Sequence, residues 1–271
     1  MKKSVIFILL ILIASIAIIF IIRSYKSKEI MSLIVLVEEK ESPLDSLQLE
    51  KLDIQMEDRV LKANFLLKNE TAPAIFICTG NGEALYEWLP VQKYLFDKGF
   101  SSYVFSYSGF GNSTGTPTET SLYEDALSAY NQFISVTPNS EKRIALSHSM
   151  GSAPLHGIAN KMEPAPSKLI IHAPFSSIQQ VLVEKEITST TFQWLWPNIW
   201  NNIDYARDIR IPILYVHSKN DQTISYSHSQ DLQQAAGDNA TILLLEDFGH
   251  NAIYKNVSDS LYLPILDFIN H

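Results

Sequence analysis

The sequence predicts an α/β fold with a mostly parallel central sheet flanked by helices, preceded by one N-terminal transmembrane helix. Two patterns carry this prediction. From Pro73 onward, short apolar runs alternate with turn residues and amphipathic segments, which is typical of alternating strands and helices. Earlier in the chain, residues 5–22 are apolar at every position except Ser15, and such a run is long enough for a helix to cross a bilayer.

The N-terminal segment is predicted to be a membrane anchor over residues 1–28, followed by one domain over residues 29–271. A cleaved signal peptide is the alternative. The apolar run is long for a signal peptide, no small-residue cleavage site closes it, and basic residues follow it. Basic residues flank the run on both sides, so charge does not decide its orientation. Because only a short tail precedes the run, we expect a single-pass protein whose domain lies on the extracytoplasmic side.

The composition limits the classes of function. With 271 residues, of which 46% are apolar and 18% charged, the chain fits one large domain with a sizeable core. A net charge of −8 argues against nucleic acid as a partner, because phosphate binding needs a basic surface. The single cysteine, Cys78, allows no intrachain disulfide. Metal motifs of the H-E-x-x-H type and a dinucleotide fingerprint are missing, so we expect no metal and no cofactor.

The elements of the domain follow from its apolar runs. Residues 51–67 alternate apolar and polar around a polar turn, which predicts a β-hairpin. Further strands are predicted at 74–79, 101–107, 143–148, 168–173, 212–218 and 241–246. Helices are predicted between them, near 84–98, 119–136, 151–162 and 226–236. The segment from about residue 176 to 208 is predicted to be a short lid insertion.

Ser149 is the candidate nucleophile. It directly follows the strand at 143–148 and precedes a predicted helix, so its hydroxyl would lie above the carboxyl ends of the sheet. The N–H groups at the start of that helix favour a developing negative charge. Ser147 and Gly151 are small, as a tight turn pressed between strand and helix requires. The alternative is an ordinary N-cap serine.

A candidate acid and base follow Ser149 in chain order. Asp221 lies in the turn after the strand at 212–218, and His250 lies in the loop after the strand at 241–246. A histidine can take the proton of a serine and return it to a leaving group when a carboxylate fixes its tautomer. The order serine, aspartate, histidine, each after a strand, therefore predicts a catalytic triad.

Other residues compete for these roles. His148, His172 and His217 lie near strand ends, but none of them follows the last strand. Asp247 lies three residues before His250 on the same loop, where it does not easily reach the far ring nitrogen. A turn aspartate that bonds only its own backbone is the alternative for the predicted acid.

The Gly-rich segment FICTGNGEAL, after the first predicted parallel strand, is the candidate oxyanion loop. In an enzyme of this type one oxyanion donor is the backbone N–H of the residue after the nucleophile, here Met150. A second N–H comes from the Gly-rich loop, and Asn81 is the best candidate. The alternative is a Gly-rich turn that binds no ligand.

Together these motifs resemble those of the α/β-hydrolase family. From about residue 73 to 269 the chain is similar to membrane-tethered serine hydrolases of the lysophospholipase-like and depalmitoylase-like branch, and to the serine aminopeptidase-like domain. The resemblance rests on TGNGE, SYSGFGNSTGTPTE, SHSMGSAP, IHAPFSSI, PILYVHSKNDQTI and FGHN. It implies an α/β-hydrolase fold, the triad Ser149, Asp221 and His250, and an oxyanion hole at Asn81 and Met150.

The chain departs from the family pattern at five positions. Thr79 replaces the histidine before the oxyanion-loop glycine, and Ser147 replaces the first glycine of the nucleophile turn. Ser106 and Ser108 stand where the family tends to carry aspartate and arginine, and Ser218 replaces a glycine before the predicted acid. These changes bear on loop geometry and substrate preference more than on the reaction type.

Aromatic residues gather in the predicted lid, at Phe192, Trp194, Trp196 and Trp200. We expect them to form an apolar wall that binds an acyl chain. The alternative is that they only pack the lid onto the domain.

The predicted function is a membrane-anchored serine hydrolase that cleaves carboxylic esters or thioesters through an acyl-enzyme. Its expected substrate is a small-molecule or lipid ester, or an acylated protein. Two alternatives stay open: an amidase or aminopeptidase that uses the same triad, and a catalytically silent binding protein with the hydrolase fold.

Overall fold

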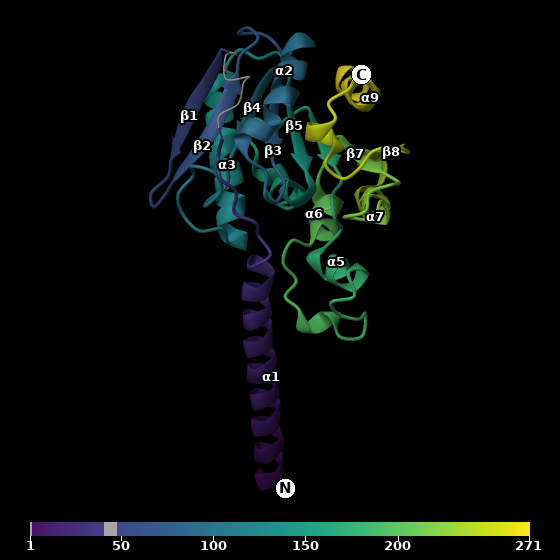
Figure 1. The fold of residues 1–271 in the computed structure, drawn as a ribbon. Coiled ribbons are helices and arrows are strands. Elements are labelled where there is room, and N and C mark those ends of the chain that lie inside the picture. The colour runs from purple at the N-terminus through teal and green to yellow at the C-terminus, as the bar shows by residue number, and fades with distance from the viewer. Residues whose placement is uncertain (1, 41–47) are drawn as a thin grey trace.

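The domain is built on one twisted sheet with helices on both faces (Figure 1). The computed structural model describes residues 2–40 and 48–271, and at residues 2–8, 10 and 11 it describes the backbone alone. Within these residues the sheet has eight strands in the order β1-β2-β4-β3-β5-β6-β7-β8. The pairs β1–β2 and β2–β4 are antiparallel, and all other neighbours are parallel. The predicted mostly parallel sheet is confirmed.

Each predicted strand is present, and each lies within two residues of its expected bounds. The hairpin forms β1 and β2, and the six apolar runs form the others: β1 Leu49–Gln55, β2 Val60–Leu66, β3 Ala74–Cys78, β4 Ser101–Phe105, β5 Arg143–His148, β6 Lys168–His172, β7 Ile213–Ser218 and β8 Ala240–Leu245.

The helices between the strands also follow the predicted pattern. Those that match predicted segments are η2 Leu85–Trp88, α2 Leu89–Asp97, α3 Glu119–Val136, η3 Ser149–Gly151, α4 Ser152–Ile158, η4 Ala159–Lys161 and α7 Ser227–Ala236. Helices outside the predicted segments are α1 Lys2–Met31, where only a transmembrane span was expected, α5 Ile178–Glu184, η5 Gln193–Leu195, α6 Asn202–Asp208, η6 Gly237–Asn239, α8 Ala252–Lys255 and α9 Asp259–Asn270.

The core has two halves, one on each face of the sheet. Along β3, Phe76 and Cys78 point into one half, whereas Ile75 and Ile77 point into the other. Helices α3, α4, α6 and α7 cover the first face, and α2, α8 and α9 cover the second. A central parallel strand buried on both faces reads as a continuous apolar run, which explains why the sequence located these strands.

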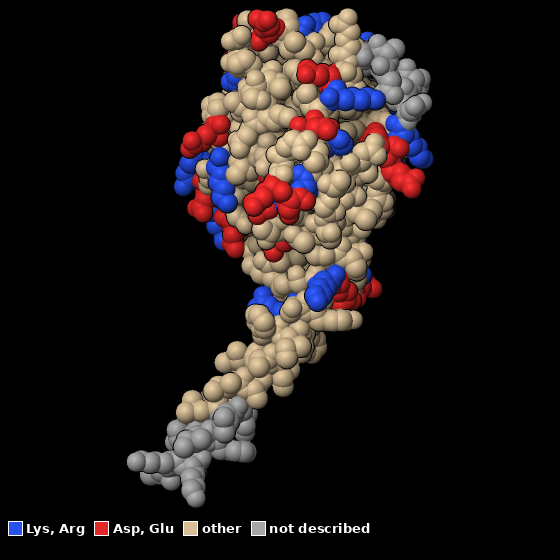
Figure 2. Space-filling model, turned by 90° about the vertical axis from the view of Figure 1, so that its left-hand side faces the viewer, with Lys and Arg blue, Asp and Glu red and all other residues tan. Residues whose placement is uncertain are grey.

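Helix α1 extends away from the domain (Figure 1). Charged side chains gather where α1 meets the domain, and the visible face of its described outer part carries none (Figure 2). Among the residues that the structure describes, no helix is both long and apolar enough to cross a membrane. The predicted anchor over residues 1–28 is therefore not confirmed. Part of it, residue 1 and the side chains of residues 2–8, 10 and 11, lies outside the described residues.

The segment after α1, residues 32–40, joins the helix to the domain and is called the connecting segment below. Just before it, Ile30 on the last turn of α1 is 1% exposed and belongs to the core. Within it, the carbonyl oxygen of Val37 accepts the backbone N–H of Gly111 at 2.8 Å. The predicted division of the chain at residue 28 and the predicted lid at 176–208 stay predictions.

Candidate active site

Ser149 lies on a sharp turn between β5 and the helical residues that follow it. Its φ of +49° is in the left-handed region, which a residue other than glycine rarely adopts. The turn leaves no room for a side chain at Gly151, where a Cβ atom would lie 2.4 Å from the carbonyl oxygen of Cys78 and 2.5 Å from that of Thr79. Close packing against the loop after β3 thus explains the small residue two positions after Ser149.

The structure brings together the three residues of the predicted triad. The Ser149 hydroxyl and Nε2 of His250 are 2.9 Å apart, and Nδ1 of His250 and Oδ2 of Asp221 are 2.7 Å apart. An ionised carboxylate only accepts, so Nδ1 of His250 carries a hydrogen and donates it to Asp221. Nε2 is then free to accept the hydrogen of the Ser149 hydroxyl. Asp221 comes from the turn after β7, and His250 comes from the loop after β8.

Electrostatics favour a neutral His250 beside an ionised Asp221. Burial lowers the pKa of His250 below its usual 6.5, and the hydrogen bond to Asp221 only partly opposes this. For Asp221, burial acts to raise the pKa, but hydrogen bonds from His217 and His250 outweigh it and hold that pKa well below its usual range. At neutral pH the pair is therefore an imidazole with a free acceptor nitrogen, held by a carboxylate.

His217 is a second partner of Asp221 that sequence reasoning did not assign. Its Nε2 lies 3.0 Å from the carbonyl oxygen of Ile224 and 3.3 Å from Oδ2 of Asp221. Because a carbonyl oxygen only accepts, this nitrogen carries a hydrogen, which faces both oxygens. Its Nδ1 bonds the hydroxyl of Ser229 at 2.7 Å. His217 therefore acts on the carboxylate and does not reach Ser149.

The other histidines that competed for the role of base are also buried. Neither ring nitrogen of His172 has a hydrogen-bond partner within the described residues. Burial, with a smaller effect of the neighbouring His148, holds the pKa of His172 well below 6.5. His148 bonds Glu83 through Nδ1 and the backbone carbonyl oxygen of His250 through Nε2. Among the described residues His250 is the imidazole that bonds Ser149.

A cavity of about 350 Å³ opens beside Ser149 and His250. Apart from these two, its walls are mostly aliphatic and aromatic. They come from the last turn of α1, the connecting segment, η3, α5, α8 and several loops. The other lining residues are Ile30, Leu33, Ile34, Asn81, Glu83, Met150, Phe175, Ile178, Val181, Trp200, Thr223, Ile224, Asn251 and Tyr254. Asn81 and Met150, the predicted oxyanion-hole residues, thus line the same cavity as Ser149.

Of the four lid aromatics predicted to bind substrate, the structure places one at this cavity. Trp200 lines it. Trp196 is buried elsewhere, with the ammonium of Lys26 in α1 4.3 Å from its ring centroid. Phe192 and Trp194 are 58% and 52% exposed and are not among the residues that line the cavity. Besides Trp200, the apolar wall includes aliphatic residues of the last turn of α1, of the connecting segment and of α5.

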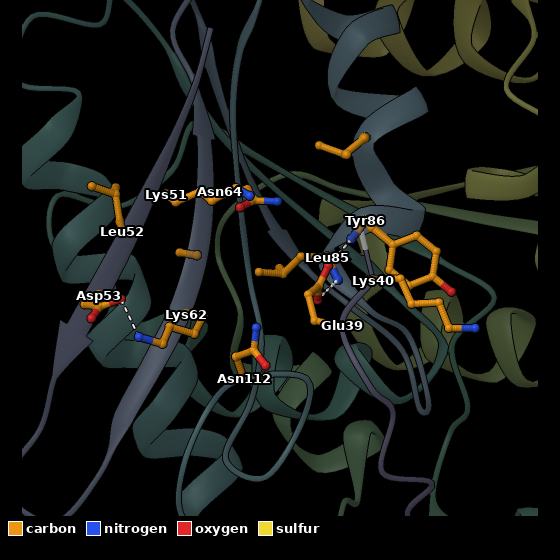
Figure 3. Close-up of a pocket in the computed structure, with 12 residues that line it drawn as sticks. Glu39, Lys40, Lys51, Leu52, Asp53, Lys62, Asn64, Leu85, Tyr86 and Asn112 are labelled. Carbon is orange, nitrogen blue, oxygen red and sulfur yellow. Dashed lines mark hydrogen bonds and ion pairs between the residues drawn. The ribbon is translucent and has the colours of Figure 1, made fainter. Parts of the chain in front are cut away.

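A second cavity of about 350 Å³ lies between the connecting segment and the hairpin β1–β2 (Figure 3). It is more polar than the first. The carboxylate of Glu39 accepts the backbone N–H groups of Leu85 and Tyr86, and Lys62 pairs with Asp53 at 2.7 Å. The Glu39 bonds tie the connecting segment to the start of η2, and the Lys62–Asp53 pair joins the two strands of the hairpin. These contacts account for both carboxylates that Figure 3 labels.

Sheet topology, helix placement and the turn at Ser149 together define an α/β-hydrolase fold. The chain belongs to the family described as serine aminopeptidase, S33, whose model matches residues 69–205. The protein is thus a hydrolase by family.

Individual relatives are distant. The chain is 23% identical to the uncharacterized protein YfhR of Escherichia coli K12 over 229 residues, which cover 81% of this chain and 80% of that one. It is 26% identical over 190 residues to the uncharacterized membrane protein YNL320W of Saccharomyces cerevisiae, with 68% and 67% covered. Its fold resembles that of the Pyrococcus furiosus esterase Pf2001, with a TM-score of 0.71, 14% identity, and 88% and 95% covered.

Proposed function

We propose that the protein is a serine hydrolase that cleaves carboxylic esters or thioesters of acyl chains. One observation carries the proposal: the hydrogen-bonded series Ser149, His250, Asp221 lies at the wall of a largely apolar cavity. Catalysis by such a series needs a nucleophile, a base in reach of it and a carboxylate that orients the base. All three are within hydrogen-bond distance here.

In the proposed reaction the hydroxyl of Ser149 attacks the acyl carbonyl carbon while Nε2 of His250 takes its proton. Asp221 holds the imidazole and stabilises its charge. The backbone N–H groups of Asn81 and Met150 are proposed to bind the oxyanion. His250 then gives the proton to the leaving alcohol or thiol, and the acyl-enzyme is cleaved when water attacks with the same histidine as base.

The lining of the cavity favours an acyl substrate over a peptide with a free amino group. An ammonium group needs a carboxylate that is free to bind it. Among the described lining residues the one carboxylate is that of Glu83. It is already bonded to the backbone N–H of Gly80, the indole N–H of Trp88 and the ring of His148. An acyl chain, in contrast, finds aliphatic and aromatic walls.

A substrate panel tests this function. We expect the full-length protein to hydrolyse p-nitrophenyl esters and matched acyl thioesters of medium chain length in preference to aminoacyl p-nitroanilides. Ser149→Ala should lower kcat/KM by about 1,000-fold or more. Ser147→Ala is the matched control, because its hydroxyl lies two residues away, is buried and has no hydrogen-bond partner within the described residues.

Three outcomes would contradict the proposal. Near-wild-type turnover by Ser149→Ala would show that Ser149 is not the nucleophile. No turnover and no labelling of folded protein by a fluorophosphonate probe would favour the catalytically silent alternative. Preference for the aminoacyl anilides would favour the aminopeptidase alternative.

Membrane attachment through α1, with the domain on the extracytoplasmic side, is a separate part of the proposal. Its support is the apolar run over residues 5–22 and the exposure of described side chains along α1, such as 65% for Ile16 and 73% for Phe20. A yeast relative is also named a membrane protein.

Fractionation tests the attachment. We expect the full-length protein to stay with membranes in a carbonate wash, and a Leu12→Lys, Ile16→Lys, Phe20→Lys variant to leave them. Recovery of intact full-length protein in the supernatant would contradict attachment. An N-terminus that begins after residue 22 in mature protein would favour the cleaved signal peptide.

A further inference from the structure

Glu83 and His148 form a buried acid–base pair that takes no chemical step in the proposed reaction. Glu83 is 3% exposed and His148 is fully buried. Oε1 of Glu83 and Nδ1 of His148 are 2.5 Å apart and share a hydrogen bond. Burying two ionisable side chains has a large desolvation cost, which further hydrogen bonds must offset.

The Glu83 carboxylate holds the loop of the proposed oxyanion hole. Its second oxygen, Oε2, accepts the backbone N–H of Gly80 at 2.6 Å and the indole N–H of Trp88 at 3.0 Å. The loop packs directly on this carboxylate, since a Cβ atom at Gly80 would lie 2.4 Å from its Oε1. Gly80 immediately precedes Asn81, so the position of Glu83 bears on where the proposed oxyanion donor lies.

The His148 ring holds the loop that carries His250. Its Nε2 lies 3.0 Å from the backbone carbonyl oxygen of His250. Because that oxygen only accepts, Nε2 carries a hydrogen, while Nδ1 shares a second hydrogen with Glu83. The ring centroid of His148 lies 4.9 Å from that of His250, and His148 is the residue directly before Ser149.

We propose that Glu83 and His148 are positioning residues for catalysis. One continuous set of hydrogen bonds joins the backbone of Gly80 to the backbone of His250 through the side chains of Glu83 and His148. His148 is itself the residue directly before Ser149, so the set also adjoins the turn that bears the nucleophile. These are the three segments that bear the proposed oxyanion donor, the nucleophile and the base. Errors of a fraction of an ångström between such groups slow a reaction, and backbone hydrogen bonds to a buried pair fix them. The inference rests on the proposed function.

Kinetics of Glu83→Leu on a preferred ester test the inference in the full-length protein. The oxyanion donors act on the transition state more than on the bound substrate. We therefore expect kcat per folded active site to fall by about 100-fold, while KM stays within about threefold. Glu83→Gln keeps an oxygen that accepts from Gly80 and Trp88, so it should recover most of this loss. Folded sites are counted by titration to the endpoint with a fluorophosphonate.

Glu87→Leu is the matched control. Its carboxylate lies four residues further on and accepts the backbone N–H of Ala84 at 3.0 Å. It takes no part in the bonds to His148. We expect kcat and KM of Glu87→Leu to stay near those of the wild type.

A second variant, His148→Gln, keeps the experiment decisive should Glu83→Leu not fold. One amide is too short to reach partners at opposite edges of an imidazole, so kcat should fall by about tenfold with little change in KM. Equal kcat for Glu83→Leu and Glu87→Leu would overturn the inference, and so would a loss confined to KM. Wild-type turnover by Ser149→Ala would instead overturn the proposed function.

Discussion

Val35 donates its backbone N–H to the side-chain oxygen of Asn81 at 2.8 Å, and so ties the connecting segment to the proposed oxyanion loop. The Asn81 amide in turn donates to the carbonyl oxygen of Leu33 at 3.0 Å. Next to it, Gly82 has a φ of +72°, and a Cβ atom there would lie 3.2 Å from the Cβ of Val35. The loop is thus fixed from outside by the segment that follows α1.

The first prediction concerns this pair of bonds. Asn81→Ala keeps the backbone N–H that is proposed to bind the oxyanion, but it loses both side-chain bonds. We expect kcat to fall by about tenfold with little change in KM, measured on the preferred ester. Asn81→Asp keeps an oxygen that accepts the backbone N–H of Val35, so its kcat should fall less. Equal kinetics for Asn81→Ala and the wild type would show that the bonds do not position the loop.

The second prediction concerns pH. A general base works in its deprotonated form, and burial lowers the pKa of His250 below 6.5. The acidic limb of kcat/KM should therefore have its midpoint below pH 6.5, and activity should persist in mildly acidic buffer. A pH–rate profile with the neutral ester checks this. A midpoint at or above pH 6.5 would contradict the stated protonation state of His250.

The third prediction concerns acyl-chain length. Ile34→Trp adds bulk to the apolar wall of the cavity, so KM for a long acyl ester should rise by about tenfold while an acetyl ester is hydrolysed as before. Ile187→Trp is the control, because Ile187 is 52% exposed and does not line the cavity. The same change for both esters, or for both variants, would mean that the acyl chain binds elsewhere.

The fourth prediction concerns the turn at Ser149. Gly151→Ala places a Cβ atom against two backbone carbonyl oxygens, which cannot move aside as a flexible side chain can. We expect the free energy of unfolding to fall by about 3 kcal/mol and activity to be lost. Gly249→Ala is the control, because a Cβ atom at Gly249 would meet nothing within 4 Å. Its free energy of unfolding should equal that of the wild type. Denaturant unfolding of both variants measures the difference.

The strands could be predicted from the sequence, because short apolar runs bounded by turn residues are typical of buried strands. The contacts among Ser149, Asp221 and His250 follow from the same pattern, since the carboxyl ends of parallel strands meet at one edge of the sheet. Helix α9 was not predicted from the sequence. Pro264 lies inside it, and proline ordinarily ends a helix.

Two parts of the site depend on contacts between segments that are far apart in the chain. The segment over residues 176–208, predicted to be a lid, has only short helices, so no periodic pattern in it indicates that Trp200 is buried while Trp194 is exposed. Leu33 and Ile34 follow the apolar helix in a stretch without a period, and their contact with the cavity appears only once the chain is folded. From the sequence, Glu83 could be placed only in a loop and His148 only at a strand end, so their contact could not be predicted.

The last turn of α1 contributes Ile30 to the same cavity that holds Ser149. A shortened protein that starts after Met31, as a biochemist would prepare for easier handling, therefore lacks a piece of the pocket as well as the helix. Rate constants measured on such a truncated form would describe a cavity that is wider and more open to water. Inhibitors selected against that form would fit the full-length protein less well.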